Sequence, residues 1–165
     1  MTLATSVDSA IGAARRLYDR LGKELHEDYV VRAQLPRLAE LLQALHEQMR
    51  SIGLLELCSE CGRGPHGGCC FAEMAGEADT TLLIINLLLG GTVAHQDTGS
   101  AAECCFLGAT GCTLLCKPVF CLSYSCPQMT GRLAREALAR LDQTCAEVLR
   151  RQICLEDRIR SFPTK

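Results

Sequence analysis

The chain has 165 residues, a length that suits a single domain, and 48% of them are hydrophobic. With no Trp and only 4% aromatic residues, the protein is expected to have a core of Leu, Ile, Val and Ala side chains. The formal charge of −2 argues against nucleic acid as a partner, because phosphate backbones are bound by a basic face.

Residues 1–56 are predicted to form two amphipathic helices. In the first, apolar residues recur at intervals of three and four across residues 7–25, and Ser6 or Asp8 could cap its start. Gly22 weakens this helix, so the pattern leaves open whether it ends there or continues.

The second predicted helix begins around Pro36, because proline is tolerated in a first helical turn, and it closes at Gly53. The first 20 residues do not resemble an export signal, since charged residues such as Asp8 and Asp19 interrupt them. A location in the reducing cytoplasm is therefore expected.

Residues 78–89 are strongly apolar and are predicted to form a short buried helix, with Asp79 as its cap and Gly90 after its end. A strand is the alternative, but the abundance of Leu over β-branched residues favours the helix. The run is too short to span a membrane and contains Asn86, so no membrane segment is expected.

Residues 127–165 are predicted to contain one further helix, opened by Pro127 or Thr130. Cys145 falls on its apolar stripe and is expected in the core, whereas Cys154 has charged neighbours and is expected at the surface.

The fold class predicted from these patterns is mainly α. A small helical scaffold, with residues 1–56 before and residues 127–165 after, is expected to hold two irregular cysteine-rich metal-binding loops within residues 57–126, all as one domain.

Ten of the twelve cysteines lie within residues 57–126, and they fall into two blocks. The first block is a C-x2-C pair followed by two adjacent cysteines, and the second block holds six cysteines. In order, the ten are Cys58, Cys61, Cys69, Cys70, Cys104, Cys105, Cys112, Cys116, Cys121 and Cys126. In a reducing compartment this density and spacing indicate metal binding rather than disulfides.

The first block supplies four sulfurs within 13 residues, the number that holds one tetrahedral zinc ion or one cubane iron–sulfur cluster. The Gly-rich residues 62–68 can fold the adjacent pair back towards the C-x2-C pair. Because neighbouring side chains diverge, Cys69 and Cys70 are expected to serve different metals, or one is expected to bind while the other packs.

The order of these motifs resembles that of the YkgJ-like cysteine-cluster family, whose CxxCxxCC domain is described as zinc- or iron-chelating. After the first block, C-x-F-L, a further cysteine, and Lys117 and Pro118 followed by Cys121 match the family signature in order and local spacing. The resemblance covers residues 58–126, under half of the chain. A flagellin lysine methylase with a similar motif is associated with a [4Fe-4S] cluster.

By position, the resemblance implies seven cysteine ligands. They are Cys58, Cys61, Cys69, Cys70, Cys104, Cys112 and Cys121. Cys126, which the family signature lacks, brings the candidate set to eight, enough for two four-sulfur sites. The chain also departs from the family in its longer gap after Cys61 and in Lys117, which replaces an Arg and keeps only the charge.

Three further residues are left open as ligands: Cys105, Cys116 and His66. Lys117 is expected either to fix a turn together with Pro118 or to offset thiolate charge near the metal.

The predicted function is metal binding, and an iron–sulfur cluster is favoured over zinc because of the surplus of cysteines, the adjacent pair and the methylase analogy. An iron–sulfur centre indicates electron transfer or redox sensing, with a redox or other protein partner. Zinc would instead make the region a structural or interaction module without catalytic activity. Enzymatic and metallochaperone roles are further alternatives, and an enzyme would need an open coordination position or a substrate pocket.

Overall fold

The computed structural model describes residues 3–62, 68–96, 102–108 and 111–163. Over these residues the architecture is mainly α-helical, as the sequence predicts. The helices in chain order are α1 (Leu3–Glu27), α2 (Tyr29–Ser51), α3 (Leu54–Gly62), the 3-10 helix η1 (Ala72–Glu77), α4 (Thr80–Leu88), α5 (Val119–Ser123), α6 (Pro127–Arg132) and α7 (Arg135–Arg160). A small hairpin of β1 (Leu107–Gly108) and β2 (Gly111–Cys112) precedes α5.

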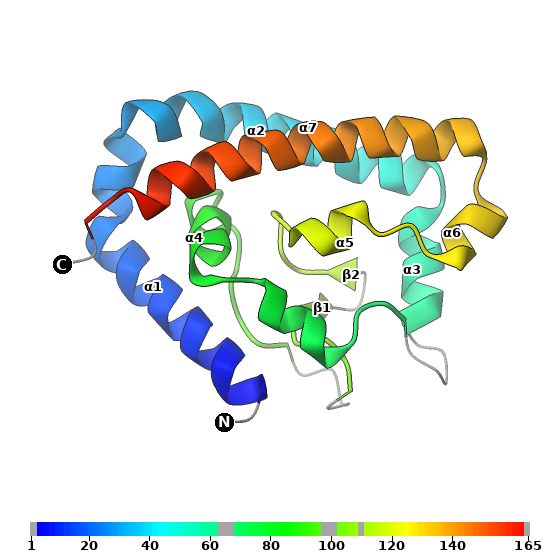
Figure 1. Ribbon diagram of the computed structural model, residues 1–165, viewed down its shortest axis with the longest axis horizontal. Helices are drawn as coiled ribbons and strands as arrows, with labels where there is room; N and C mark the ends of the chain where they lie inside the picture. Colours follow the sequence, from blue (N-terminus) through cyan, green and yellow to red (C-terminus); the bar gives the residue numbers. More distant parts are fainter. Residues whose placement is uncertain (1–2, 63–67, 97–101, 109–110, 164–165) are drawn as a thin grey trace.

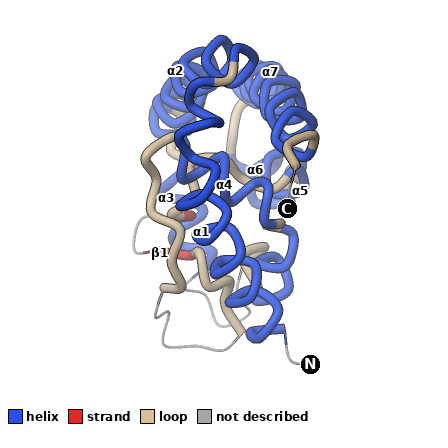
Figure 2. The backbone as a smooth tube through the Cα atoms, turned by 90° about the vertical axis from the view of Figure 1, so that its left-hand side faces the viewer, coloured by secondary structure: helices blue, strands red, loops and turns tan. Residues whose placement is uncertain are grey.

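Of the three long helices, α2 and α7 lie side by side along one edge of the molecule (Figure 1). The view turned by 90° shows the same pairing (Figure 2). Helix α1 packs against α4 below them. Helices α3 and α6 contact each other at the end away from the C-terminus. Helix α3 follows the end of α2, and α6 precedes the start of α7. The pairing of α2 with α7 thus holds α3 and α6 close together.

The predicted apolar stripes form the core, which is aliphatic as expected. Every helix of more than ten residues buries one stripe, and α4 is buried almost all round. The buried stripe residues of the long helices are Val7, Ile11, Ala14 and Leu25, then Leu38 and Leu45, then Leu141, Cys145 and Val148. Phe106, between the helices, is the largest of the fully buried side chains.

Helix α1 is longer than predicted. It already contains Ser6 and Asp8, so neither residue caps its start. It also passes through Gly22, where a Cβ atom would lie only 3.3 Å from the ring of Tyr18. The glycine therefore makes room for an aromatic ring on the helix surface and does not end the helix.

The prediction that the second helix begins around Pro36 was wrong, because Pro36 lies inside α2. The helix begins after Asp28, whose carboxylate accepts hydrogen bonds from the backbone N–H groups of Val30 and Val31 at 3.0 and 3.1 Å. This cap and the burial of Val31 extend the helix ahead of the proline, even though Pro36 cannot donate a backbone hydrogen bond.

The helix predicted over residues 78–89 is confirmed as α4. Asp79 caps it by accepting a hydrogen bond from the Leu82 N–H at 2.8 Å, and Gly90 follows it with a φ of 77°. The prediction of a single C-terminal helix was wrong in one respect. Leu133 and Ala134 adopt extended backbone angles and divide it into α6 and α7.

No described helix is both long and apolar enough to cross a membrane.

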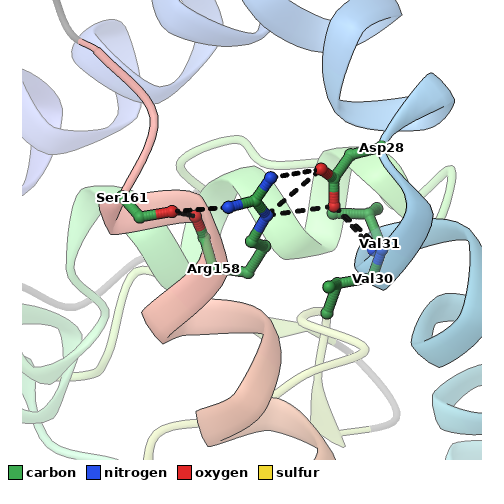
Figure 3. A network of polar contacts seen from close by, with 5 residues as sticks. All are labelled: Asp28, Val30, Val31, Arg158 and Ser161. Carbon is green, nitrogen blue, oxygen red and sulfur yellow. Dashed lines mark hydrogen bonds and ion pairs between the residues drawn. The ribbon is translucent and has the colours of Figure 1, made fainter.

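Asp28 also ties α2 to α7. Its carboxylate accepts hydrogen bonds from the guanidinium of Arg158, at 2.6 Å from Nη2 and 3.1 to 3.2 Å from Nε, and Arg158 also donates to Ser161 (Figure 3). The hydrogen bond from Arg158 holds the pKa of Asp28 below its usual value of 3.8. One side chain therefore caps α2 and fixes the far end of α7 against it.

Asp28→Ala is expected to lower the free energy of unfolding by about 1–2 kcal/mol, because it removes both the cap and the ion pair. Asp28→Asn keeps a capping oxygen and should cost less. Because the folded-state pKa is lowered, the ion pair stabilises the protein above the unfolded-state pKa, and this contribution is lost as the pH falls through the folded-state pKa. Urea unfolding from about pH 7 to about pH 3 should therefore show the gap between Asp28→Asn and the wild type shrinking. A gap that does not change with pH would contradict this.

Candidate functional site

The C-x2-C pair lies on a helix and not in the irregular loop that the sequence suggested. Cys58 and Cys61 belong to α3, and their spacing of three residues places both on one helical face. Leu54 and Leu57 are buried and anchor this short helix to the core. The sulfur pair is thus presented by a helical turn.

A short antiparallel backbone pairing joins the two cysteine blocks. The Cys104 N–H donates to the Cys70 carbonyl at 2.9 Å, and Phe71 forms an isolated bridge with Glu103. On the other side of that bridge, residues 72 and 102 are hydrogen bonded at 2.9 Å. The adjacent cysteine pair of the first block is therefore held directly beside the start of the second block.

The hairpin then brings Cys112 back towards the same place. Leu107 pairs with Cys112 across β1 and β2, and the Leu107 N–H donates to the Cys104 carbonyl at 2.8 Å. Phe106 anchors the turn in the core, and its backbone N–H donates a hydrogen bond to the Cys104 sulfur. Two cysteines that are eight positions apart thus converge around one buried aromatic ring.

Asn86 fixes the path of the chain between the hairpin and α5. Its side-chain Nδ2 donates to the carbonyls of Cys116 and Leu82, both at 3.0 Å, and its Oδ1 accepts from the Cys116 N–H at 3.1 Å. From the sequence, Asn86 was expected only to disfavour a membrane span. A lone amide within an apolar run was the signal for this role, because a buried polar side chain needs partners.

Four of the predicted ligands gather around the end of α3, and we call them the first thiol group: Cys58, Cys61, Cys69 and Cys126. Burial raises the pKa of the Cys58 thiol to about 11. Three neighbouring thiols add to this shift, in decreasing order Cys69, Cys126 and Cys61. Cys126 reaches the group because it immediately precedes α6, which contacts α3.

The other four predicted ligands form the second thiol group: Cys70, Cys104, Cys112 and Cys121. Burial raises the pKa of Cys121 to about 12, and the charges of Cys112 and Cys104 add to the effect, followed by that of Cys69. The charges of Cys112 and Cys104 also raise the pKa of Cys70. Each thiol group therefore combines cysteines from separate parts of the chain.

Cys69 and Cys70 lie at the boundary of the two groups and are hydrogen bonded to each other through their side chains. This bond lowers the pKa of Cys69 to about 6 and raises that of Cys70. Cys69 is the more exposed of the two.

The remaining four cysteines were not assigned to either group, although Cys105 lies close enough to the second thiol group for Cys104 and Cys112 to add to the effect of burial on its pKa. Cys105 and Cys116 are buried, and burial raises their pKa values to about 11 and about 12. Cys145 is buried and Cys154 is exposed, and both placements confirm the predictions made for them. His66 lies in the part of the chain that the structure does not describe.

Lys117 supplies positive charge close to the second thiol group. Its charge opposes the effect of burial on the pKa values of Cys116 and Cys121. Pro118, the next residue, is buried and precedes the first turn of α5. Both alternatives from the sequence, an electrostatic role for the lysine and a turn fixed by the proline, are compatible with this placement.

The thiols of each group lie near one another, but they are not arranged as a metal site. Across the described ranges, no three Cys, His, Asp or Glu side chains are arranged so that they could hold a metal ion. The donor set fits a soft metal in type and in number, since each group offers four sulfurs. A metal centre would therefore require the sulfurs of each group to draw together or to bind at separate atoms of a larger inorganic core.

Comparisons of the chain with protein-family models, with curated proteins and with solved structures find no match.

Asn86→Leu is expected to lower the free energy of unfolding by about 2–5 kcal/mol, because it leaves the buried N–H and carbonyl of Cys116 without their partner. Leucine has the same number and branching of non-hydrogen side-chain atoms as asparagine, so the change mainly removes the hydrogen bonds. Gln143→Leu on the exposed face of α7 is the matched control and should stay within about 0.5 kcal/mol of the wild type. Equal stability of the two variants in denaturant unfolding would show that Asn86 does not hold this segment.

Proposed function

We propose that this protein binds two metal centres, one in each thiol group, and that iron–sulfur clusters are the preferred occupants. The proposal rests on how the adjacent cysteines are divided. Cys69 lies with Cys58, Cys61 and Cys126 of the first thiol group, whereas Cys70 lies close to Cys104 and Cys112 of the second. The chain thereby offers two complete sets of four sulfurs, which is the ligand number of such centres.

The surplus of cysteines and the adjacent pair Cys69 and Cys70 favour a cluster over a single zinc ion. A zinc ion takes its four sulfurs at one atom, whereas a cubane cluster binds each cysteine at a different iron atom. The backbone N–H of Phe106, which donates to the Cys104 sulfur, is the kind of contact that raises the reduction potential of a cluster.

A cluster in either group would supply one-electron transfer, so electron transfer or redox sensing is the role we propose, with a redox or other protein partner. The chain's own residues would set its properties: Lys117 balances charge and buried neighbours exclude water. Membership of the YkgJ-like family and a cytoplasmic location belong to the same proposal, because both rest on the cysteine motif and its need for reduced thiols.

Zinc is the second candidate. The region between α3 and α6 holds few regular elements, and zinc bound to four thiolates would contribute folding free energy there. The protein would then be a structural or interaction module.

Anaerobic purification followed by analysis of metal and acid-labile sulfide separates the two candidates. Iron with an equal amount of sulfide, in a brown protein that dithionite bleaches, supports clusters. A colourless protein that retains stoichiometric zinc and no sulfide would overturn the iron–sulfur assignment in favour of zinc.

Single serine substitutions should separate the two centres. Cys126→Ser is expected to remove the centre of the first thiol group and Cys121→Ser that of the second, so each lowers the metal content by about half. Cys154→Ser, at an exposed position outside both groups, should leave the content unchanged. If Cys126→Ser keeps all its metal while Cys121→Ser loses half, the first thiol group is not a four-sulfur site.

Lys117→Met is expected to lower the midpoint potential of the centre in the second thiol group by some tens of millivolts, on the order of what loss of one nearby positive charge produces. The reduced centre is the more negative one, so it loses more from the missing charge. Lys117→Arg keeps the charge and should stay near the wild-type potential. Redox titration of the three proteins checks this, and equal potentials in Lys117→Met and Lys117→Arg would show that Lys117 acts only through the fold.

A further inference from the structure

A cavity of about 500 Å³ opens beside the first thiol group. Its volume falls in the range of small-molecule sites. Five cysteine side chains line it: Cys58, Cys61, Cys69, Cys70 and Cys126. The rest of the lining is mainly apolar and comes from α3, α5, α6 and the segment before η1.

The aromatic residues of the protein are concentrated here. The chain has only four Phe and three Tyr, and three of these seven, Phe71, Phe120 and Tyr124, line this cavity. They stay 43%, 44% and 43% exposed, so packing of the core does not account for them. Phe120 and Tyr124 are stacked, with ring centroids 5.2 Å apart and planes 12° from parallel. A third flat ring can extend such a stack.

The described residues that line the cavity carry no charged side chain, since none of them is Asp, Glu, Lys, Arg or His. A charged ligand would lose its hydration there without gaining a partner, which disfavours both carboxylates and amines. The lining also includes the Tyr124 hydroxyl and the Gln128 amide, which can donate hydrogen bonds to one polar atom of a ligand.

We infer that this cavity binds an uncharged, planar aromatic compound of one or two rings that carries a hydroxyl or carbonyl oxygen. The flat face of the compound stacks on Phe120 and Tyr124, and its oxygen is bound by Gln128 or Tyr124. Binding in this cavity places the compound against the sulfurs of the first thiol group. The binding itself needs no metal, whereas a role for this compound as a substrate of a metal centre rests on the proposed function.

The test uses 2-naphthol, which is uncharged at neutral pH and does not react with thiols, titrated into the full-length protein by calorimetry. Saturable one-to-one binding is expected in the metal-free reduced protein, because a metal centre held by Cys58, Cys61, Cys69 and Cys126 would occupy part of the same cavity. Naphthalene-2-sulfonate, of similar shape but charged, should bind at least about tenfold more weakly. The saturated analogue decahydro-2-naphthol, which cannot stack, should also bind more weakly.

Two variants locate the site. Phe120→Ala and Tyr124→Ala change half-exposed side chains of α5 and its C-cap, and each should weaken 2-naphthol binding about tenfold. Tyr29→Ala alters an aromatic side chain that is 85% exposed on α2 and should leave binding unchanged. In the metal-free protein, 2-naphthol should also slow alkylation of Cys69 and Cys126 but not that of Cys154.

Absence of saturable binding in the metal-free protein, or an equal loss in Tyr29→Ala, would overturn the inference. So would binding that leaves the alkylation of Cys69 and Cys126 unchanged. These results are independent of the metal analysis: a protein that binds 2-naphthol but takes up no metal overturns the proposed function alone, and a protein that takes up metal but does not bind 2-naphthol in its metal-free form overturns the cavity assignment alone.

Discussion

The backbone pairing of Cys70 with Cys104 is the constraint from which the arrangement of the sulfurs follows. It holds two stretches of chain side by side that are separated by η1, α4 and the residues after them. Without that contact, the chain leading out of α3 would not be aligned with the chain leading into β1, and Cys70 would not be held beside Cys104. Asn86 supports the same constraint from the other side, because it fixes the segment that runs from the hairpin to α5. The first contact is a backbone hydrogen bond donated by the buried Cys104, and the second joins the buried side chain of Asn86 to the backbone of the buried Cys116. At buried positions an unpaired donor or acceptor is costly.

The long helices serve this arrangement by fixing where α3 and α6 meet. Asp28 and Arg158 hold the start of α2 against the end of α7, so the opposite ends of the two helices also lie together (Figures 1 and 3). That opposite end carries the C-x2-C pair on one side and Cys126 on the other. Because the shifted pKa values of Cys58, Cys121 and the buried cysteines lie above neutrality, most of these thiols are protonated in the metal-free protein. Binding of a soft metal must then displace protons, which couples metal affinity to pH.

The surface beside the sulfurs has a different character from the rest of the protein. The helical faces elsewhere carry ion pairs such as Arg150 with Glu147, whereas the described residues that line the cavity beside the first thiol group include aromatic rings and no charged side chain. A frame that needed only to hold metal would gain nothing from half-exposed Phe and Tyr side chains, since each leaves apolar area in water. The combination of thiols and stacked rings is therefore better explained by a small ligand than by folding.

Local sequence determined the helices and the core. The apolar stripes of α1, α2 and α7, the cap of α4 at Asp79 and the core position of Cys145 all follow from periodicity and side-chain chemistry, which act over a few neighbouring residues. Sequence also identified the eight candidate ligands, although a resemblance of motifs supplied seven of them. Only the tertiary structure decided that Pro36 lies within a helix, that Cys58 and Cys61 are helical, and that Cys70 lies beside Cys104. Those outcomes depend on contacts between residues far apart in the chain, such as Asn86 with Cys116 and Cys70 with Cys104, and no local pattern encodes the energy of such contacts.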